Sequence, residues 1–219
     1  MKGKLFFLML VFVVPAMAQV QRRNQLGPKL GFGYYNLSYG SSSKQTGLTR
    51  TLDSLQVGNT ALNIGVSYKR RLTRELSLAT GIELGKYQVN YLENSLPSLA
   101  AYHQKILQLN VPIGLEYNII SDNWQPFFGV YVQGSKIIQS EMDYILQQGW
   151  NTTTLQSYLP ATTWLYGMAI TAGAQLPLAD HWTFEPAIWA TYTLKSLAAN
   201  NFIQRPYQLS FQAAVLYTF

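Results

Sequence analysis

The chain has 219 residues, a formal net charge of +6 and no cysteine. Its Lys and Arg residues are scattered rather than gathered into a patch, so the positive charge does not indicate nucleic-acid binding. Without cysteine, disulfides, thiolate metal sites and an acylated N-terminal cysteine are excluded. Only 12% of the residues are charged and 14% are aromatic, a combination that favours a transmembrane β-barrel.

The first 18 residues have the three parts of a secretory signal peptide. Lys2 and Lys4 form the basic region, and residues 5–14 are an apolar run too short to span a bilayer. The run Ala16–Ala18 matches a cleavage site. We therefore expect residues 1–18 to be removed and the mature chain to begin at Gln19; an uncleaved signal anchor is the alternative.

Eight strand-like segments follow in the chain. They cover residues 28–38, 60–71, 75–91, 104–119, 125–138, 163–178, 182–195 and 207–219. The connections alternate between long (39–59, 92–103, 139–162 and 196–206) and short (72–74, 121–124 and 179–181). Long external loops, short periplasmic turns and both termini inside are typical of outer-membrane barrels. We predict an all-β fold, an eight-stranded antiparallel transmembrane β-barrel over residues 28–219, preceded by a short periplasmic segment at 19–27.

Within the segments apolar and polar side chains alternate with a period of two, as Leu62, Asn63 and Ile64 illustrate. In a membrane barrel the apolar face meets lipid, whereas a soluble barrel such as a lipocalin turns it inward. Periodicity does not separate these two, but the signal peptide and the aromatic content favour the membrane. The aromatic residues expected at the membrane interfaces are Tyr34, Tyr68, Tyr117, Phe128, Trp182, Phe184, Tyr217 and Phe219.

Two prolines fall inside predicted strands. Pro112 and Pro186 each lack the backbone N–H that a ladder hydrogen bond requires. We expect a bulge or a lost ladder bond at each.

The last segment alternates from Tyr207 to the final residue, with Leu216 as the exception on its polar face. A soluble domain rarely ends in an aromatic-rich edge strand, because such an edge templates aggregation. The ending resembles the C-terminal signal by which bacterial outer-membrane barrels are recognised for insertion. Tyr217 and Phe219 are therefore predicted assembly-signal residues, with the barrel assembly machinery as partner during biogenesis.

Charged side chains are predicted to fill the lumen. The candidates for lumenal salt bridges are Lys29, Lys69, Arg71, Glu75, Glu83, Glu116 and Glu185, of which Arg71 and Glu75 lie beside the first short turn. Opposite charges in a narrow lumen must pair, because an unpaired buried charge costs several kcal/mol. A gated ion path is the alternative, although eight strands leave room only for side chains.

The sequence offers few residues that could support catalysis or metal binding. The two histidines, His103 and His181, are expected on opposite sides of the membrane, so they cannot share a metal. Some eight-stranded barrels are lipid A acylases or deacylases that use His with Ser near the outer leaflet. Here the comparable set is His103 with Ser95 or Ser98, and Glu93 as a third group. We expect a solvated loop histidine, no catalytic residues, no metal and no cofactor.

The fourth and fifth segments carry a family resemblance. The runs Leu107–Tyr117 (LQLNVPIGLEY) and Gln125–Gly134 (QPFFGVYVQG) are similar to the outer-membrane β-barrel family of Bacteroidota that includes PorT-like proteins. The resemblance implies an eight-stranded barrel in the outer membrane and implies little about activity, since fold does not determine function. The run Asp53–Leu55 resembles the short O-glycosylation motif of secreted Bacteroidota proteins, which makes Ser54 a candidate acceptor.

The function we predict is non-enzymatic, a structural or accessory subunit of an outer-membrane assembly such as the type IX secretion apparatus. An outer-leaflet lipid-modifying enzyme and a narrow channel are the alternatives. The expected partners are outer-membrane lipids and lipopolysaccharide, the barrel assembly machinery and other outer-membrane proteins. Nucleic acid is not expected.

Overall fold

The computed structural model describes residues 24–41, 59–92, 99–120, 124–148, 151–158, 164–196 and 202–219. Within them nine strands form one sheet: β1 (Asn24–Ser41), β2 (Thr60–Arg71), β3 (Leu76–Leu92), β4 (Leu99–Asn118), β5 (Gln125–Gln148), β6 (Asn151–Tyr158), β7 (Trp164–Ala179), β8 (Trp182–Thr193) and β9 (Phe202–Thr218). No helix in these ranges is long and apolar enough to cross a membrane.

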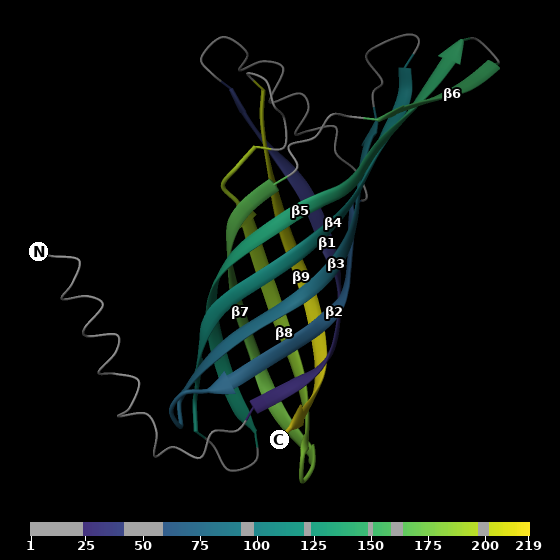
Figure 1. The fold of residues 1–219 in the computed structure, drawn as a ribbon. Coiled ribbons are helices and arrows are strands. Elements are labelled where there is room, and N and C mark those ends of the chain that lie inside the picture. The colour runs from purple at the N-terminus through teal and green to yellow at the C-terminus, as the bar shows by residue number, and fades with distance from the viewer. Residues whose placement is uncertain are drawn as a thin grey trace, which may run out of the picture.

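Eight of the strands close into an antiparallel barrel in the order β1-β2-β3-β4-β5-β7-β8-β9, with β9 paired to β1 (Figure 1). At the seam the Phe219 amide donates to the Asn24 carbonyl at 2.9 Å, and the Asn24 amide donates to the Phe219 carbonyl at 3.1 Å. The predicted eight-stranded antiparallel barrel is confirmed.

The strands are strongly tilted. Following the register around the barrel from Asn24 leads back to β1 at Tyr34, a stagger of 10 residues. With the usual rise and spacing of strands, this stagger in eight strands gives a tilt of about 40°. An eight-stranded barrel of this kind has an interior just wide enough for side chains.

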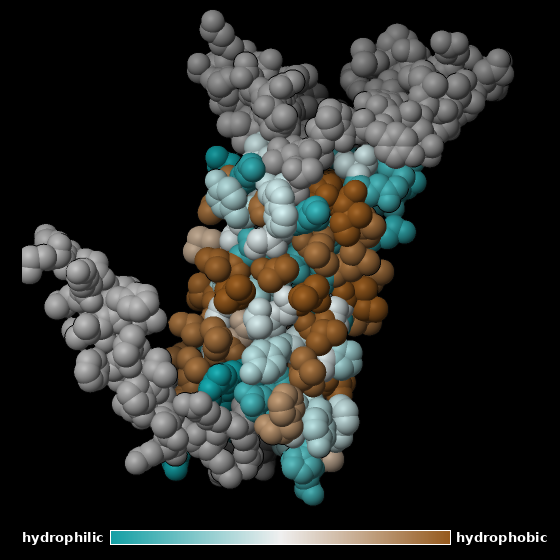
Figure 2. Space-filling view, viewed as in Figure 1, coloured by the Kyte–Doolittle hydropathy of each residue, from teal (hydrophilic) through white to brown (hydrophobic). Residues whose placement is uncertain are grey.

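Side chains alternate between the two faces of the wall as predicted. On β2, Leu62 and Ile64 are exposed on the outside, whereas Asn63 and Lys69 are buried inside. Leu216, the predicted exception on β9, is fully buried in the interior. Figure 2 shows the apolar side chains gathered over the middle of the barrel wall. The outer face therefore matches a hydrocarbon environment.

The two prolines singled out in the sequence, Pro112 and Pro186, interrupt ladders without changing their register. Pairing between β3 and β4 is lost at Pro112, and pairing between β7 and β8 is lost at Pro186, while the register on either side stays the same. Pro28 interrupts the β1–β9 ladder in the same way. Lost ladder bonds, rather than bulges, are thus the outcome at Pro112 and Pro186.

The start of β1 corrects the predicted domain boundary. The barrel begins at Asn24, so residues 24–27 belong to the wall and not to the predicted periplasmic segment 19–27. The reason is the seam, because Asn24 and Gln25 find partners in the last residues of the chain. Residues 1–23, including the predicted signal peptide, lie outside the described residues.

The prediction of a loop over residues 139–162 is wrong in part. β5 continues to Gln148, β6 folds back on it, and the early part of β4 pairs with the same stretch of β5. Residues 99–106 of β4, residues 140–148 of β5 and the whole of β6 are here called the β4–β5–β6 extension, which projects beyond the barrel (Figure 1). A register shift beside Leu107 places a bulge at Ile138, which breaks the alternation on which the prediction rested. Three consecutive threonines, residues 152–154, supply β-propensity for β6.

Candidate functional site

A layer of charged side chains crosses the lumen near the end where β1 begins and β9 ends. Lys69 on β2 reaches Glu116 on β4 and Glu185 on β8, with Nζ–Oε2 distances of 2.5 Å to each. The Lys69 Nζ also lies 4.4 Å from the centre of the Phe127 ring. The Tyr131 hydroxyl donates a hydrogen bond to Glu116. One lysine thus bridges two buried carboxylates from opposite parts of the wall.

A second ion pair lies beside this layer. Lys29 Nζ is 2.7 Å from Glu83 Oε1 and 4.1 Å from the centre of the Trp189 ring. Each lumenal lysine therefore faces carboxylate oxygen on one side and an aromatic face on another, which together replace its hydration shell.

Farther toward the long connections, the lumen is filled by aromatic, aliphatic and amide side chains. The rings of Tyr35 and Tyr87 stack with centroids 4.3 Å apart. The Tyr87 hydroxyl donates to Asn63 Oδ1 and accepts from Asn110 Nδ2, both at 2.8 Å. The buried apolar residues of this upper lumen are Tyr35, Leu37, Ala61, Tyr87, Val89, Ile106, Ile137 and Leu165.

Little free space remains between these layers. The cavity beside the lumenal ion pairs measures about 20 Å³. This volume is close to the minimum that one water molecule requires. At this level the lumen of the described barrel is therefore filled by its own side chains.

The structure brings five of the seven predicted lumenal charges together. They are Lys29, Lys69, Glu83, Glu116 and Glu185. The other two lie at the rim.

At that rim the Arg71 guanidinium donates to Gln125 Oε1 at 3.1 Å. Glu75 is exposed in the β2–β3 turn and shares a hydrogen bond with the Tyr117 side chain. Arg71 lies outside the lumenal ion pairs because it is the last residue of β2, and Glu75 because it belongs to the turn that follows.

The sequence analysis missed the aromatic partners of the lumenal charges, which are Phe127 for Lys69, Tyr131 for Glu116 and Trp189 for Lys29. Phe127, Tyr131 and Trp189 all point into the barrel. A signal was present, because Phe127 and Tyr131 alternate with the outward-facing Phe128 and Val130 on the same strand. Placing Trp189 over Lys29 required the register of β8, which no local pattern gives.

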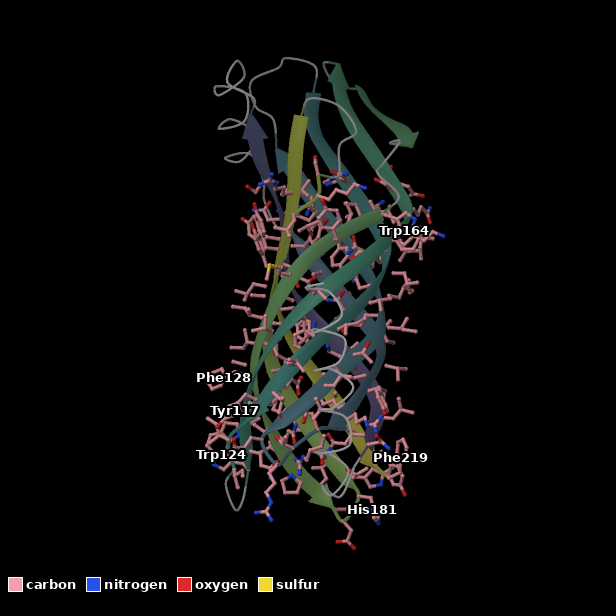
Figure 3. All side chains as sticks on the ribbon, turned by 60° about the vertical axis from the view of Figure 1, so that its left-hand side comes forward. Tyr117, Trp124, Phe128, Trp164, His181 and Phe219 are labelled. Atoms are coloured by element: carbon pink, nitrogen blue, oxygen red, sulfur yellow. The ribbon has the colours of Figure 1, made fainter. Side chains whose placement is uncertain are left out.

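The two histidines lie toward opposite ends of the barrel, as predicted. His103 lies within β4 and not in a loop as expected, and its Nδ1 is 2.8 Å from Asn90 Oδ1. His181 lies in the β7–β8 turn at the other end, next to Tyr217 (Figure 3). Glu93, Ser95, Ser98 and Ser54 lie outside the described residues. Among the residues with described positions, no three His, Asp or Glu side chains are grouped to hold a metal.

Aromatic side chains gather at two levels of the outer face (Figure 3). The lower group comprises Tyr68, Tyr117, Trp124, Phe128, Trp182, Phe184, Tyr217 and Phe219. The upper group comprises Tyr34, Trp164, Tyr166, Tyr192 and Tyr207. In the lower group the rings of Tyr217 and Trp182 lie 5.1 Å apart, and Phe219 is exposed. Two aromatic girdles around an apolar wall define the class, a transmembrane β-barrel with a filled lumen.

Comparison with known families agrees with this class. The family model described as the outer membrane protein beta-barrel domain matches residues 17–198. The chain belongs to this family, and it is an outer-membrane β-barrel protein of the bacterial cell. The end with the short turns, where β1 begins and β9 ends, is then periplasmic, and the β4–β5–β6 extension lies outside the cell.

A solved structure shows the same fold. The chain is similar to the outer membrane protein OprG from Pseudomonas aeruginosa, with 14% identity, 90% of this chain and 95% of that chain covered, and a TM-score of 0.55. Weaker likenesses include Ail of Yersinia pestis (8% identity, 89% and 99% covered, TM-score 0.43) and the outer membrane protease OmpT from Escherichia coli (11% identity, 92% and 98% covered, TM-score 0.40). No curated protein matches the chain in sequence.

Proposed function

We propose that this protein is a non-enzymatic structural or accessory subunit that binds other outer-membrane proteins through its β4–β5–β6 extension. The extension carries the proposal, because β6 pairs with β5 alone among the described strands. A strand with one unpaired edge presents a row of N–H and C=O groups that a strand of another chain can complete.

The filled lumen favours this function over a channel. Ions would have to displace Lys69 and its two carboxylate partners, which are almost fully buried. Separating a buried ion pair leaves uncompensated charge and costs several kcal/mol. Planar-bilayer recordings test the alternative, and we expect no steady conductance from the purified protein.

The environment of His103 favours the same function over a lipid-modifying enzyme. A histidine that activates a serine needs a free ring nitrogen beside the hydroxyl and an orienting group behind it. The described partner of His103 is the amide oxygen of Asn90. We expect His103→Ala to leave the mass profile of lipid A unchanged.

The more specific assignment to a PorT-like subunit of a type IX secretion apparatus rests on two adjacent strands. The runs Leu107–Tyr117 and Gln125–Gly134 pair with each other in the β4–β5 ladder, so the resemblance covers one continuous part of the wall. In such an assembly the extension would face the other subunits.

Co-purification from native outer membranes in mild detergent tests the docking role. We compare the intact protein with a Thr153→Pro/Thr154→Pro variant. Because successive N–H groups of a strand point to opposite edges, this variant removes one donor of the β5–β6 ladder and one donor of the open edge of β6. The matched control is Thr153→Ser/Thr154→Ser. We expect the proline variant to lose its partner proteins and to keep the heat-modifiable gel shift of a folded barrel. Equal recovery of partners with both variants would refute docking through β6.

The C-terminal residue is proposed to act as an assembly signal. Phe219 is exposed on the outer face, so in the finished barrel it makes a small contribution to stability. We expect Phe219→Ala to lower the amount of inserted protein in cells and to cost at most about 1.5–3 kcal/mol after refolding in detergent. Tyr192→Ala, an exposed aromatic of the upper girdle, is the control that should insert normally. Normal insertion of Phe219→Ala combined with failed refolding would make Phe219 a packing residue.

A further inference from the structure

The residue types at the level of the upper girdle differ between the two sides of the barrel. On β7, β8, β9 and β1 it consists of tryptophan and tyrosine, whereas β3, β4 and β5 carry Lys86, Lys105 and Lys136 on the outward face. Lys136 belongs to the level of the girdle, because it pairs with Trp164 and its Nζ lies 5.7 Å from the centre of that ring. One side of the outer interface is thus cationic rather than aromatic.

A hollow in the outer wall lies among these lysines. It measures about 300 Å³ and is lined by Lys86, Lys105, Ile106, Leu107, Gln139 and Glu141. Lys86, Leu107 and Gln139 are successive register partners on β3, β4 and β5, so the hollow follows the outer face across three strands. The bulge at Ile138 opens it, because the extra residue spreads the β5 side of the ladder.

Among the described residues at the hollow, Lys105 and Asp143 pair with each other, whereas Lys86 and Glu141 form no ion pair. Glu141 accepts a hydrogen bond from the Gln139 amide, and Asp143 forms an ion pair with Lys105 at 2.8 Å. Lys86 is exposed and forms no ion pair with the described residues. A lysine at a membrane interface reaches toward the headgroups, where phosphate is the available anion.

We propose that this hollow binds the phosphorylated glycolipid of the outer leaflet. Lys86 contacts a lipid A phosphate, the exposed part of Lys105 assists it, and Leu107 lies against an acyl chain. Lys136, on the far side of β4, is placed to meet a second phosphate. Lipid A requires an apolar contact for its acyl chains and a cationic contact for its phosphates. Leu107 supplies the first and Lys86 the second.

Native mass spectrometry of the full chain in detergent, with added lipid A, tests the proposal. We compare Lys86→Gln and Lys86→Gln/Lys105→Gln with Arg70→Gln, which removes an outer-face cation at the periplasmic end. At roughly 1 kcal/mol per interfacial lysine, retention should fall about fivefold for the single variant and about thirtyfold for the double variant. Arg70→Gln should retain lipid A as the intact protein does. The single variant keeps the test decisive if the double variant, which unpairs Asp143, does not fold.

Three further arms identify the ligand. Dephosphorylated lipid A should bind no better to the intact protein than lipid A binds to the double variant. Inorganic phosphate at millimolar concentration should not displace lipid A, because it lacks the acyl chains that Leu107 contacts. Equal retention in all variants, equal binding of dephosphorylated lipid A, or displacement by an equal amount of phosphatidylglycerol would each overturn the proposal.

Discussion

The lower and upper halves of the lumen are filled in different ways. The lower half holds Lys69 between Glu116 and Glu185, whereas the upper half holds stacked tyrosine rings, aliphatic side chains and amides. Both fillings meet the same need, because a barrel of eight strands must occupy its interior with its own side chains. They differ in what a single substitution does. Removing one charge leaves the remaining buried charges without an ion-pair partner, whereas removing one methyl group leaves a small void.

The largest effect should follow from Lys69→Met. Glu116 and Glu185 then share a buried site without a cation, and we expect a loss of about 3–5 kcal/mol in the free energy of unfolding. Reversible denaturant unfolding in lipid vesicles measures it. The variant Lys69→Met/Glu116→Gln/Glu185→Gln also removes the two unpaired carboxylates and should recover most of the lost free energy of unfolding. A triple variant as unstable as the single one would show that the layer acts through packing and not through charge.

A somewhat smaller effect is expected in the upper half from Ile106→Ala. Ile106 is almost fully buried, and truncation to alanine should cost about 3 kcal/mol by loss of buried surface and a residual cavity. Ile106→Val, the graded control, should cost about 1 kcal/mol. Because the two halves share no contacts at these positions, Lys69→Met/Ile106→Ala should be additive within about 0.5 kcal/mol in the same unfolding assay. A larger coupling would mean that the halves form one cooperative layer.

The smallest effect should come from Tyr87→Phe. Removing this hydroxyl leaves Asn63 and Asn110 each without one hydrogen-bond partner, which should cost about 1–2 kcal/mol. Tyr166→Phe on the outer face is the control and should be close to neutral. Equal stability of the two variants would show that the amides of the upper half find other partners.

The faces of the strands could be predicted from the sequence, and the pairings across the lumen could not. Lipid outside and a narrow interior force the alternation of Leu62, Asn63 and Ile64, so a local pattern is enough. Lys69 and Glu185 are 116 residues apart and meet only because of the stagger of the whole barrel. No local pattern contains that stagger.

The β4–β5–β6 extension was missed for a different physical reason. After Ile138 the bulge shifts the inward and outward positions of β5 by one, so a search for strict alternation ends there. Arg71 and Glu75 were predicted in the lumen but lie at the rim. They are charged residues next to a strand end, and a shift of a few residues at that end decides between lumen and rim.

The seam between β1 and β9 has a consequence for the timing of folding. Gln25 pairs with Thr218, 193 residues farther along the chain, so this ladder has nearly the highest contact order the sequence allows. Such contacts form slowly, because the loop they close contains almost all of the 219 residues. Until then the edge of β1, with Leu30 and Phe32 on its lipid face, is open to any other strand. Survival of the newly delivered chain therefore depends on how quickly its last strand reaches its first.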